Sequence, residues 1–286
     1  MSNNSSIFRL RLAHAVARYI LYPVLYYIVR YRKRVVRNNL QIAFPNESEH
    51  QRLQWEKEFY RAFADMIMEM LAGRHIKEKD MQRFVHFDHL QEVADRCKHY
   101  GGGFFMLGHF LNWEWAVDYA NQFAPYGLQC ASIYKQLSNR YFNDLILRIR
   151  QQRGGTLIEM DRLLRAMITN RRNNATVAYA MLADQRPRVK SVKYPVTFMG
   201  QSVDMLFGTE QLAKRFAYPV YYVSILSSEL GHYELDFHLI YDPETEPDIA
   251  EGVITQRFTS HLEDNIRRNP SRWLWSHRRF LKLKKA

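Results

Sequence analysis

The feature that most constrains the fold is a short apolar run enclosed by glycines. Phe104-Phe105-Met106-Leu107 follows Gly101-Gly102-Gly103 and stops at Gly108. A continuous apolar run of this length between turn residues is typical of a strand buried on both faces. Strands of that kind belong to parallel sheets that are covered by helices on both sides.

Segments of the same kind recur along the chain and alternate with helical patterns. We expect strands at 129–133, 156–158, 176–182, 220–226 and 233–240, the last alternating as an edge or antiparallel strand does. Helical patterns cover 47–73, 112–122, 141–152, 161–172, 209–216 and 249–268. This order predicts an α/β fold with a mostly parallel central sheet flanked by helices. No Pro-, Gly- or Ser-rich linker divides the chain, so we expect a helical segment over 1–45 and one domain over 46–286.

The N-terminal segment carries an apolar run from Tyr19 to Val29 between Arg18 and Arg30. The run is shorter than the ~20 residues that a spanning helix needs, and Pro23 interrupts it. Tyrosines and basic residues surround it, which favours an anchor lying in the membrane interface. A buried N-terminal helix with a solvated basic end is the alternative. No small-residue cleavage site follows, so we expect no signal peptide.

The charge of the chain indicates an anionic partner. Lys and Arg number 41 against 29 Asp and Glu, a net charge of +12. Nucleic acid, anionic lipid head groups and an acidic carrier protein all fit this excess. The run from Trp273 to Lys285 mixes tryptophans with basic residues. That mixture fits docking on an anionic membrane and also single-stranded nucleic acid.

The candidate chemistry lies directly after the glycine-bounded strand. His109 stands at the carboxyl end of that strand, where α/β sheets place reacting groups. Glu114 follows five residues later, on the expected first turns of the next helix. A carboxylate there can accept a hydrogen bond from one imidazole nitrogen and leave the other as a base. The nucleophile would then be a substrate hydroxyl, although a lone histidine here can also be purely structural.

Several segments together resemble one enzyme family. GHFLNWEW, starting at Gly108, is similar to the histidine–acid motif of the bacterial lipid A late acyltransferases. These belong to the lysophospholipid and glycerophosphate acyltransferase superfamily, whose usual acid is Asp. The other matching segments, in order, are YRKRVVRNNL (31–40) with Ala43-Phe44-Pro45, Leu182-Ala183-Asp184-Gln185, Val196-Thr197-Phe198-Met199-Gly200 and Trp273-Leu274-Trp275-Ser276-His277-Arg278-Arg279-Phe280.

The resemblance implies acyl transfer from a carrier-protein thioester to a hydroxyl of an acylated sugar phospholipid, at the cytoplasmic face of the inner membrane. It implies that His109 is the general base and Glu114 its orienting partner. The chain departs from the family pattern at Leu111, where the family often has Gly, and in its shorter, more polar N-terminus. A lysophospholipid or an aminolipid is the alternative acceptor.

Further residues are predicted to bind substrate. Asp184 and Gln185 follow the strand at 176–182, so we expect them beside His109 to position the acceptor or brace the loop. A strand-end turn is the alternative for this pair. Phe198 and Gly200 are predicted near the acyl chain, with an ordinary turn as the alternative. The predicted substrate-binding set is Asn112, Asp184, Gln185, Phe198, Gly200 and Arg150, the last a candidate oxyanion donor or a solvated charge.

The sequence contains no pattern that is typical of a metal site, of nucleotide binding or of a serine hydrolase. The histidines and two cysteines show no ligand spacing, so no metal is expected. No phosphate-binding glycine loop, dinucleotide fingerprint or GxSxG motif occurs, and we expect no cofactor. A basic membrane- or nucleic-acid-binding module explains the charge but leaves the His109–Glu114 arrangement unexplained.

Overall fold

A computed structural model describes residues 2–136, 139–187 and 191–280. Within these residues the main sheet has seven strands in the order β1-β9-β8-β2-β5-β3-β4. β2 is parallel to β5 and β8, whereas β9 is antiparallel to β8. The strands are β1 (Val85–Phe87), β2 (Gly102–Leu107), β3 (Gln129–Tyr134), β4 (Thr156–Glu159), β5 (Val177–Leu182), β8 (Val220–Glu229) and β9 (His232–Tyr241). The mostly parallel sheet is confirmed, as is the antiparallel last strand, although β1 makes the edge.

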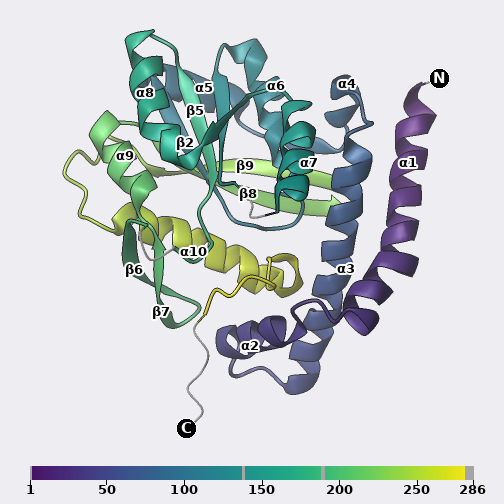
Figure 1. Ribbon diagram of the computed structural model, residues 1–286. Coiled ribbons are helices and arrows are strands. Elements are labelled where there is room, and N and C mark those ends of the chain that lie inside the picture. Colours follow the sequence, from purple (N-terminus) through teal and green to yellow (C-terminus); the bar gives the residue numbers. More distant parts are fainter. Residues whose placement is uncertain (1, 137–138, 188–190, 281–286) are drawn as a thin grey trace.

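Successive side chains of the buried strands point to opposite faces of the sheet, so the core has two halves, one on each face. Phe104 and Met106 of β2 pack into one half, and Phe105 and Leu107 into the other, as a strand buried on both faces requires. On the first face lie α8 (Leu163–Arg172), α9 (Gly208–Phe216) and α10 (Val253–Arg268); on the second lie α5 (Leu90–Tyr100) and α6 (Tyr119–Phe123). On that first face, α10 packs against β8 and β9 (Figure 1).

Three parts of the secondary structure differ from the prediction. Between α3 and β2, the short helix α4 (Glu78–Met81), the strand β1 and the helix α5 were not predicted. The helix expected over 112–122 is a 3-10 turn at Trp115–Asp118 followed by the short α6, because the preceding loop pairs with the C-terminal segment. A hairpin of β6 (Lys193–Phe198) and β7 (Gln201–Leu206) was not predicted. The remaining expected helices are confirmed, with α7 at Arg140–Gln151 and small shifts at the ends of others.

The N-terminal segment is helical and packs on the domain. α1 (Ser2–Val16) runs alongside α3 (Glu49–Gly73), and α2 (Lys33–Ala43) lies near one end of α3 (Figure 1). Two stretches of π-helix, Ala17–Leu21 and Val24–Ile28, flank Pro23, which has no N–H for a regular helical bond. One side of this segment is buried, but its outer side exposes the large apolar residues Phe8, Leu12, Tyr19, Ile20, Tyr27, Ile28 and Val29.

Among the described residues, no one helix has both the length and the apolar character to cross a membrane, although 6–28 together with 33–43, bent by 85°, meet that test as a pair.

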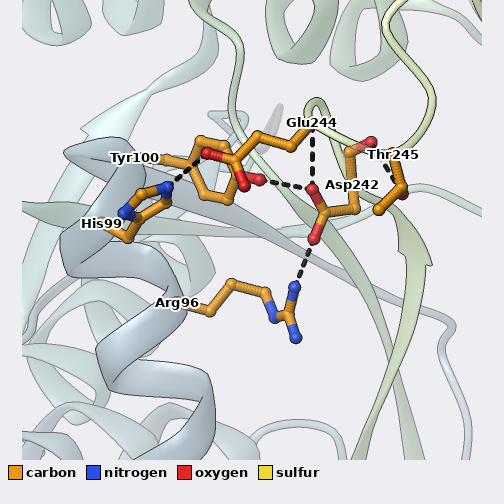
Figure 2. A network of polar contacts seen from close by, with 6 residues as sticks. All are labelled: Arg96, His99, Tyr100, Asp242, Glu244 and Thr245. Carbon is orange, nitrogen blue, oxygen red and sulfur yellow. Dashed lines mark hydrogen bonds and ion pairs between the residues drawn. The ribbon is translucent and has the colours of Figure 1, made fainter.

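A polar network braces the edge of the sheet opposite the end of β2. Asp242, just after β9, accepts hydrogen bonds from Arg96 and Tyr100 of α5 and from the backbone N–H of Glu244 (Figure 2). Burial alone would raise the pKa of Asp242, but these donors outweigh it and lower that pKa. Because β9 is antiparallel to β8, this network lies where β2 begins, away from His109.

Candidate active site

The predicted meeting of two strand ends is confirmed. β2 and β5 are neighbours in register, with Leu107 opposite Leu182. The N–H of Ala183 donates to the carbonyl oxygen of Leu107 at 3.0 Å, which extends the pairing beyond the strands. His109 follows β2, and Asp184 and Gln185 follow β5. All three residues therefore lie at the same edge of the sheet, where these two parallel strands end.

Asp184 holds the imidazole of His109. His109 Nδ1 lies 2.5 Å from Asp184 Oδ1, and the backbone N–H of His109 donates to Oδ2 at 2.8 Å. Trp273 Nε1 also donates to Oδ2, at 2.7 Å. Burial of Asp184 would raise its pKa, but His109 and these donors lower that pKa to about 2. An ionised Asp184 therefore fixes the tautomer with the proton on Nδ1, leaving a lone pair on Nε2.

Glu114 does not accept from His109, and that part of the sequence prediction is wrong. Arg150 donates to both Glu114 oxygens, at 2.9 and 2.7 Å, and Trp113 Nε1 donates at 3.1 Å. The ring of Trp113 packs edge-on against His109, with centroids 5.0 Å apart. Glu114 precedes a 3-10 turn rather than an α-helix, and its carboxylate is bound by α7.

The ion pair with Glu114 also defines the role of Arg150. Burial would raise the pKa of Glu114, but the charge of Arg150 and its hydrogen bonds lower it. The guanidinium of Arg150 is thus engaged in a two-point ion pair. It is neither a solvated charge nor aimed freely at an oxyanion.

Gln185 completes the set around the imidazole. Its side-chain nitrogen lies 3.0 Å from His109 Nε2. Because Nε2 carries the lone pair in this tautomer, the Gln185 amide is the donor. Sequence reasoning placed Gln185 beside His109, but not on this nitrogen.

The C-terminal segment forms part of the site. Residues Phe110 and Trp273 make an antiparallel bridge. Leu111 donates to the carbonyl of Arg272, and Leu274 donates to the carbonyl of His109, both at 2.9 Å. This pairing places the indole of Trp273 within hydrogen-bond distance of Asp184.

Burial of the C-terminal tryptophans overturns their predicted docking role. Trp273 and Trp275 are 2% and 0% exposed, so these rings do not contact a membrane or nucleic acid. The lysines of the predicted tail lie outside the described residues. Asn39 of α2 donates to the carbonyls of Trp275 and His277, at 2.8 and 2.7 Å. The N-terminal motif segment therefore holds the C-terminal one in place.

Phe198 and Gly200 belong to the β6–β7 hairpin. Met199 and Gly200 are its turn, with φ values of 52° and 71°, the positive pair that a type I′ turn requires. Phe198 is buried, and its ring lies 5.6 Å from that of Trp273. The geometry favours the turn for Gly200 and packing against the Asp184 donor for Phe198.

Asn112 is buried and braces the motif loop. Its Nδ2 donates to Glu69 Oε2 at 2.7 Å, and its Oδ1 accepts from the N–H of Trp115 at 3.3 Å. Glu69, which is fully buried in α3, also contacts His14 Nε2 at 2.7 Å and accepts from the hydroxyl of Tyr233 at 2.6 Å. The motif loop is thereby tied to the N-terminal helix and to β9.

A cavity of about 470 Å³ adjoins the motif loop. Leu111 and Trp113 form part of its wall, with aromatic residues of α3 and the tip of the β8–β9 hairpin opposite. Asp65 lies in the wall, and burial together with neighbouring Glu69 raises the pKa of Asp65 to about 6. The volume lies within the range of small-molecule sites.

Comparison with known families decides the class of the protein. The family model of the bacterial lipid A biosynthesis acyltransferases matches residues 6–282. The chain belongs to this family. No curated protein matches the sequence. The resemblance seen in five ordered segments is thus confirmed, and the protein is of an acyltransferase family involved in lipid A synthesis.

The backbone at Leu111, a position where the sequence resemblance led us to expect Gly, has a conformation that suits Gly better than Leu. Leu111 has a φ of 49°, in the left-handed region that favours glycine. We expect Leu111→Gly to be more stable than Leu111→Ala by about 1 kcal/mol, because both lose the side chain and only Gly relieves the backbone. Urea unfolding of the two variants measures this difference, and a more stable Ala variant would contradict the strained backbone.

Proposed function

We propose that the protein transfers a fatty acyl chain from the thioester of an acyl carrier protein to a hydroxyl of a membrane lipid, with a lipid A precursor as the first candidate acceptor. The observation that carries the proposal is the orientation of His109 by buried Asp184 at the carboxyl edge of the sheet. It supplies a base with a fixed tautomer and an unprotonated Nε2. Family membership supplies the reaction class.

The reaction follows from these positions. His109 Nε2 takes the proton of the acceptor hydroxyl as its oxygen attacks the thioester carbonyl. Asp184 stabilises the imidazolium that forms, as the carboxylate of a catalytic triad does. The tetrahedral intermediate then collapses, the carbon–sulfur bond breaks, and the thiolate takes the proton from Nε2. The product is an ester, and the carrier is released as a thiol.

The cavity beside the motif loop is the proposed lipid site. Leu111 and Trp113 connect its wall to the His109 loop, and apolar side chains of Phe59, Phe63 and Leu230 also line it. A lipid chain in this cavity would contact Trp113, whose ring centroid lies 5.0 Å from that of His109.

The N-terminal segment is the proposed membrane contact, at the cytoplasmic face of the inner membrane. Its exposed apolar residues, among them Tyr19, Ile28 and Val29, lie in a run that is flanked by arginines at 18, 30 and 32. Such a surface suits partial insertion between anionic head groups. The net charge of +12 also suits an acidic carrier protein as donor.

One observation favours a different acceptor within the same reaction. Asp65, Glu229 and Glu234 line the cavity, against a single arginine, Arg272, among its described lining residues. Acidic side chains favour an amine or a neutral hydroxyl head group over a phosphate. An aminolipid acceptor is therefore the second candidate, followed by a lysophospholipid. A binding module without activity gives no role to the His109–Asp184–Gln185 arrangement.

The test is acyl transfer by purified protein in detergent. Radiolabelled acyl chains are presented on carrier protein and on coenzyme A, with lipid A precursor, aminolipid and lysophospholipid as separate acceptors. Mass spectrometry identifies the labelled product. Transfer from carrier protein to lipid A precursor supports the proposal; transfer to aminolipid alone supports the second candidate. No transfer from either donor to any acceptor would refute both.

A further inference from the structure

Gln185 occupies the nitrogen that the proposed reaction needs. Its amide nitrogen lies 3.0 Å from His109 Nε2, the imidazole atom that carries the lone pair. An acceptor hydroxyl must hydrogen-bond to the same lone pair before it loses its proton. The amide and the acceptor therefore compete for one position.

The backbone holds Gln185 in reach of the imidazole. The residue before it, Asp184, is fixed by three donors, and Ala183 is paired to the end of β2. The Gln185 side chain is half-buried, and that of His109 is 12% exposed. The amide thus covers a nitrogen that is otherwise close to solvent.

An uncovered base beside a thioester would activate water. Water would lose a proton to Nε2 while its oxygen attacks the carbonyl, and collapse would release a fatty acid and the carrier thiol. That reaction uses the same atoms as acyl transfer, but it wastes the donor. A histidine base has no chemical means of its own to distinguish a water from a lipid hydroxyl.

We propose that Gln185 is a positioning residue that caps His109 Nε2 against water and gives way to the acceptor hydroxyl. An acceptor held in the adjoining cavity presents its hydroxyl from a fixed position, so it displaces the amide more readily than a free water does. Gln185 then sets the partition of the acyl group between lipid and water. The partition rests on the proposed function, whereas the cap itself does not.

The cap is tested without any acyl substrate. Diethyl pyrocarbonate acylates the unprotonated nitrogen of histidine, and mass spectrometry of peptides follows each site. We expect Gln185→Met and Gln185→Ala to raise the rate at His109 at least fivefold relative to exposed His50, because loss of one hydrogen bond is worth about that factor or more. Met preserves side-chain volume, so a rise in both variants reports the lost donor. An unchanged rate at His109 would overturn the cap.

The partition is tested with labelled acyl carrier protein and the acceptor that wild type uses. We expect the ratio of free fatty acid to acylated lipid to rise about tenfold in both variants, with the thermal midpoint near that of wild type. A faster reaction with pyrocarbonate but an unchanged ratio would overturn the role against water. If wild type transfers no acyl group, the proposed function fails, and the pyrocarbonate rates still decide the cap.

Discussion

Asp184→Asn is expected to lower kcat for acyl transfer by about a thousandfold, within the range of roughly 10² to 10⁴ for removal of acid–base catalysis. The asparagine oxygen can still accept from Trp273 and from the backbone N–H of His109, which both bind one carboxylate oxygen. Its amide nitrogen must then face His109 Nδ1. That contact favours the tautomer with the proton on Nε2, which has no lone pair for the acceptor.

Asp242→Asn is the matched control for this variant. Asp242 is also a buried carboxylate with three donors, but it lies at the opposite edge of the sheet. Both variants are expected to lose stability, and only Asp184→Asn is expected to lose kcat. Steady-state kinetics below the melting temperature of each protein make the comparison. Equal kcat values in the two variants would contradict the role of Asp184.

Glu114→Ala is expected to lower the free energy of unfolding by about 3–5 kcal/mol, because it leaves the Arg150 charge without its partner in the interior. The Glu114 and Arg150 side chains are only 8% and 18% exposed. Arg150→Met is expected to have an effect of similar size, because it leaves the buried Glu114 carboxylate without its partner. The double variant Glu114→Ala with Arg150→Met removes both charges, and we expect it to recover much of the loss.

Urea unfolding of the single and double variants gives the coupling directly. If the losses in free energy of unfolding of the two single variants add up to the loss in the double variant, Glu114 and Arg150 do not stabilise each other. The folded double variant also tests the predicted catalytic role of Glu114. Acyl transfer near the wild-type rate would mean that the ion pair serves the fold alone, whereas a large loss would mean that Glu114 acts on His109 through Trp113.

The sheet could be predicted because its strands carry their own signal. Each long strand is a continuous or alternating apolar run, and parallel strands end at a common edge. Those two facts placed His109 and Asp184 together before any side-chain geometry was available. The β6–β7 hairpin was missed because Pro195 interrupts the first strand and the turn is Met199-Gly200 rather than Asn-Gly or Asp-Gly.

The choice between two acids could not be made from spacing. Whether Glu114 or Asp184 binds the imidazole depends on the path of the loop after Gly108. That path is set by pairing with Arg272 to Leu274, over 160 residues away in sequence. The helix expected from Asn112 onward would have turned Glu114 differently, so the wrong local structure led to the wrong acid.

The role of Trp273 and Trp275 could not be predicted for the same reason, because it depends on contacts with residues that are far away in the sequence. A terminal Trp-Leu-Trp beside basic residues is typical of a membrane contact. In the fold, Asn39 donates to two backbone carbonyls of this segment, and both rings are buried in the hydrophobic core. The ordered motif segments at 31–40, 182–185 and 273–280 are thus parts of one connected structure around Asp184, which no single segment reveals.

The most direct test of the account is the rate of acyl transfer by His109→Ala, compared with wild type in the same detergent and with the same donor and acceptor. Circular dichroism and the thermal midpoint establish that the variant is folded. The account predicts a loss of about 10³-fold or more, since no other described side chain holds a base at that position. A folded His109→Ala protein that transfers acyl groups within threefold or so of the wild-type rate would contradict it.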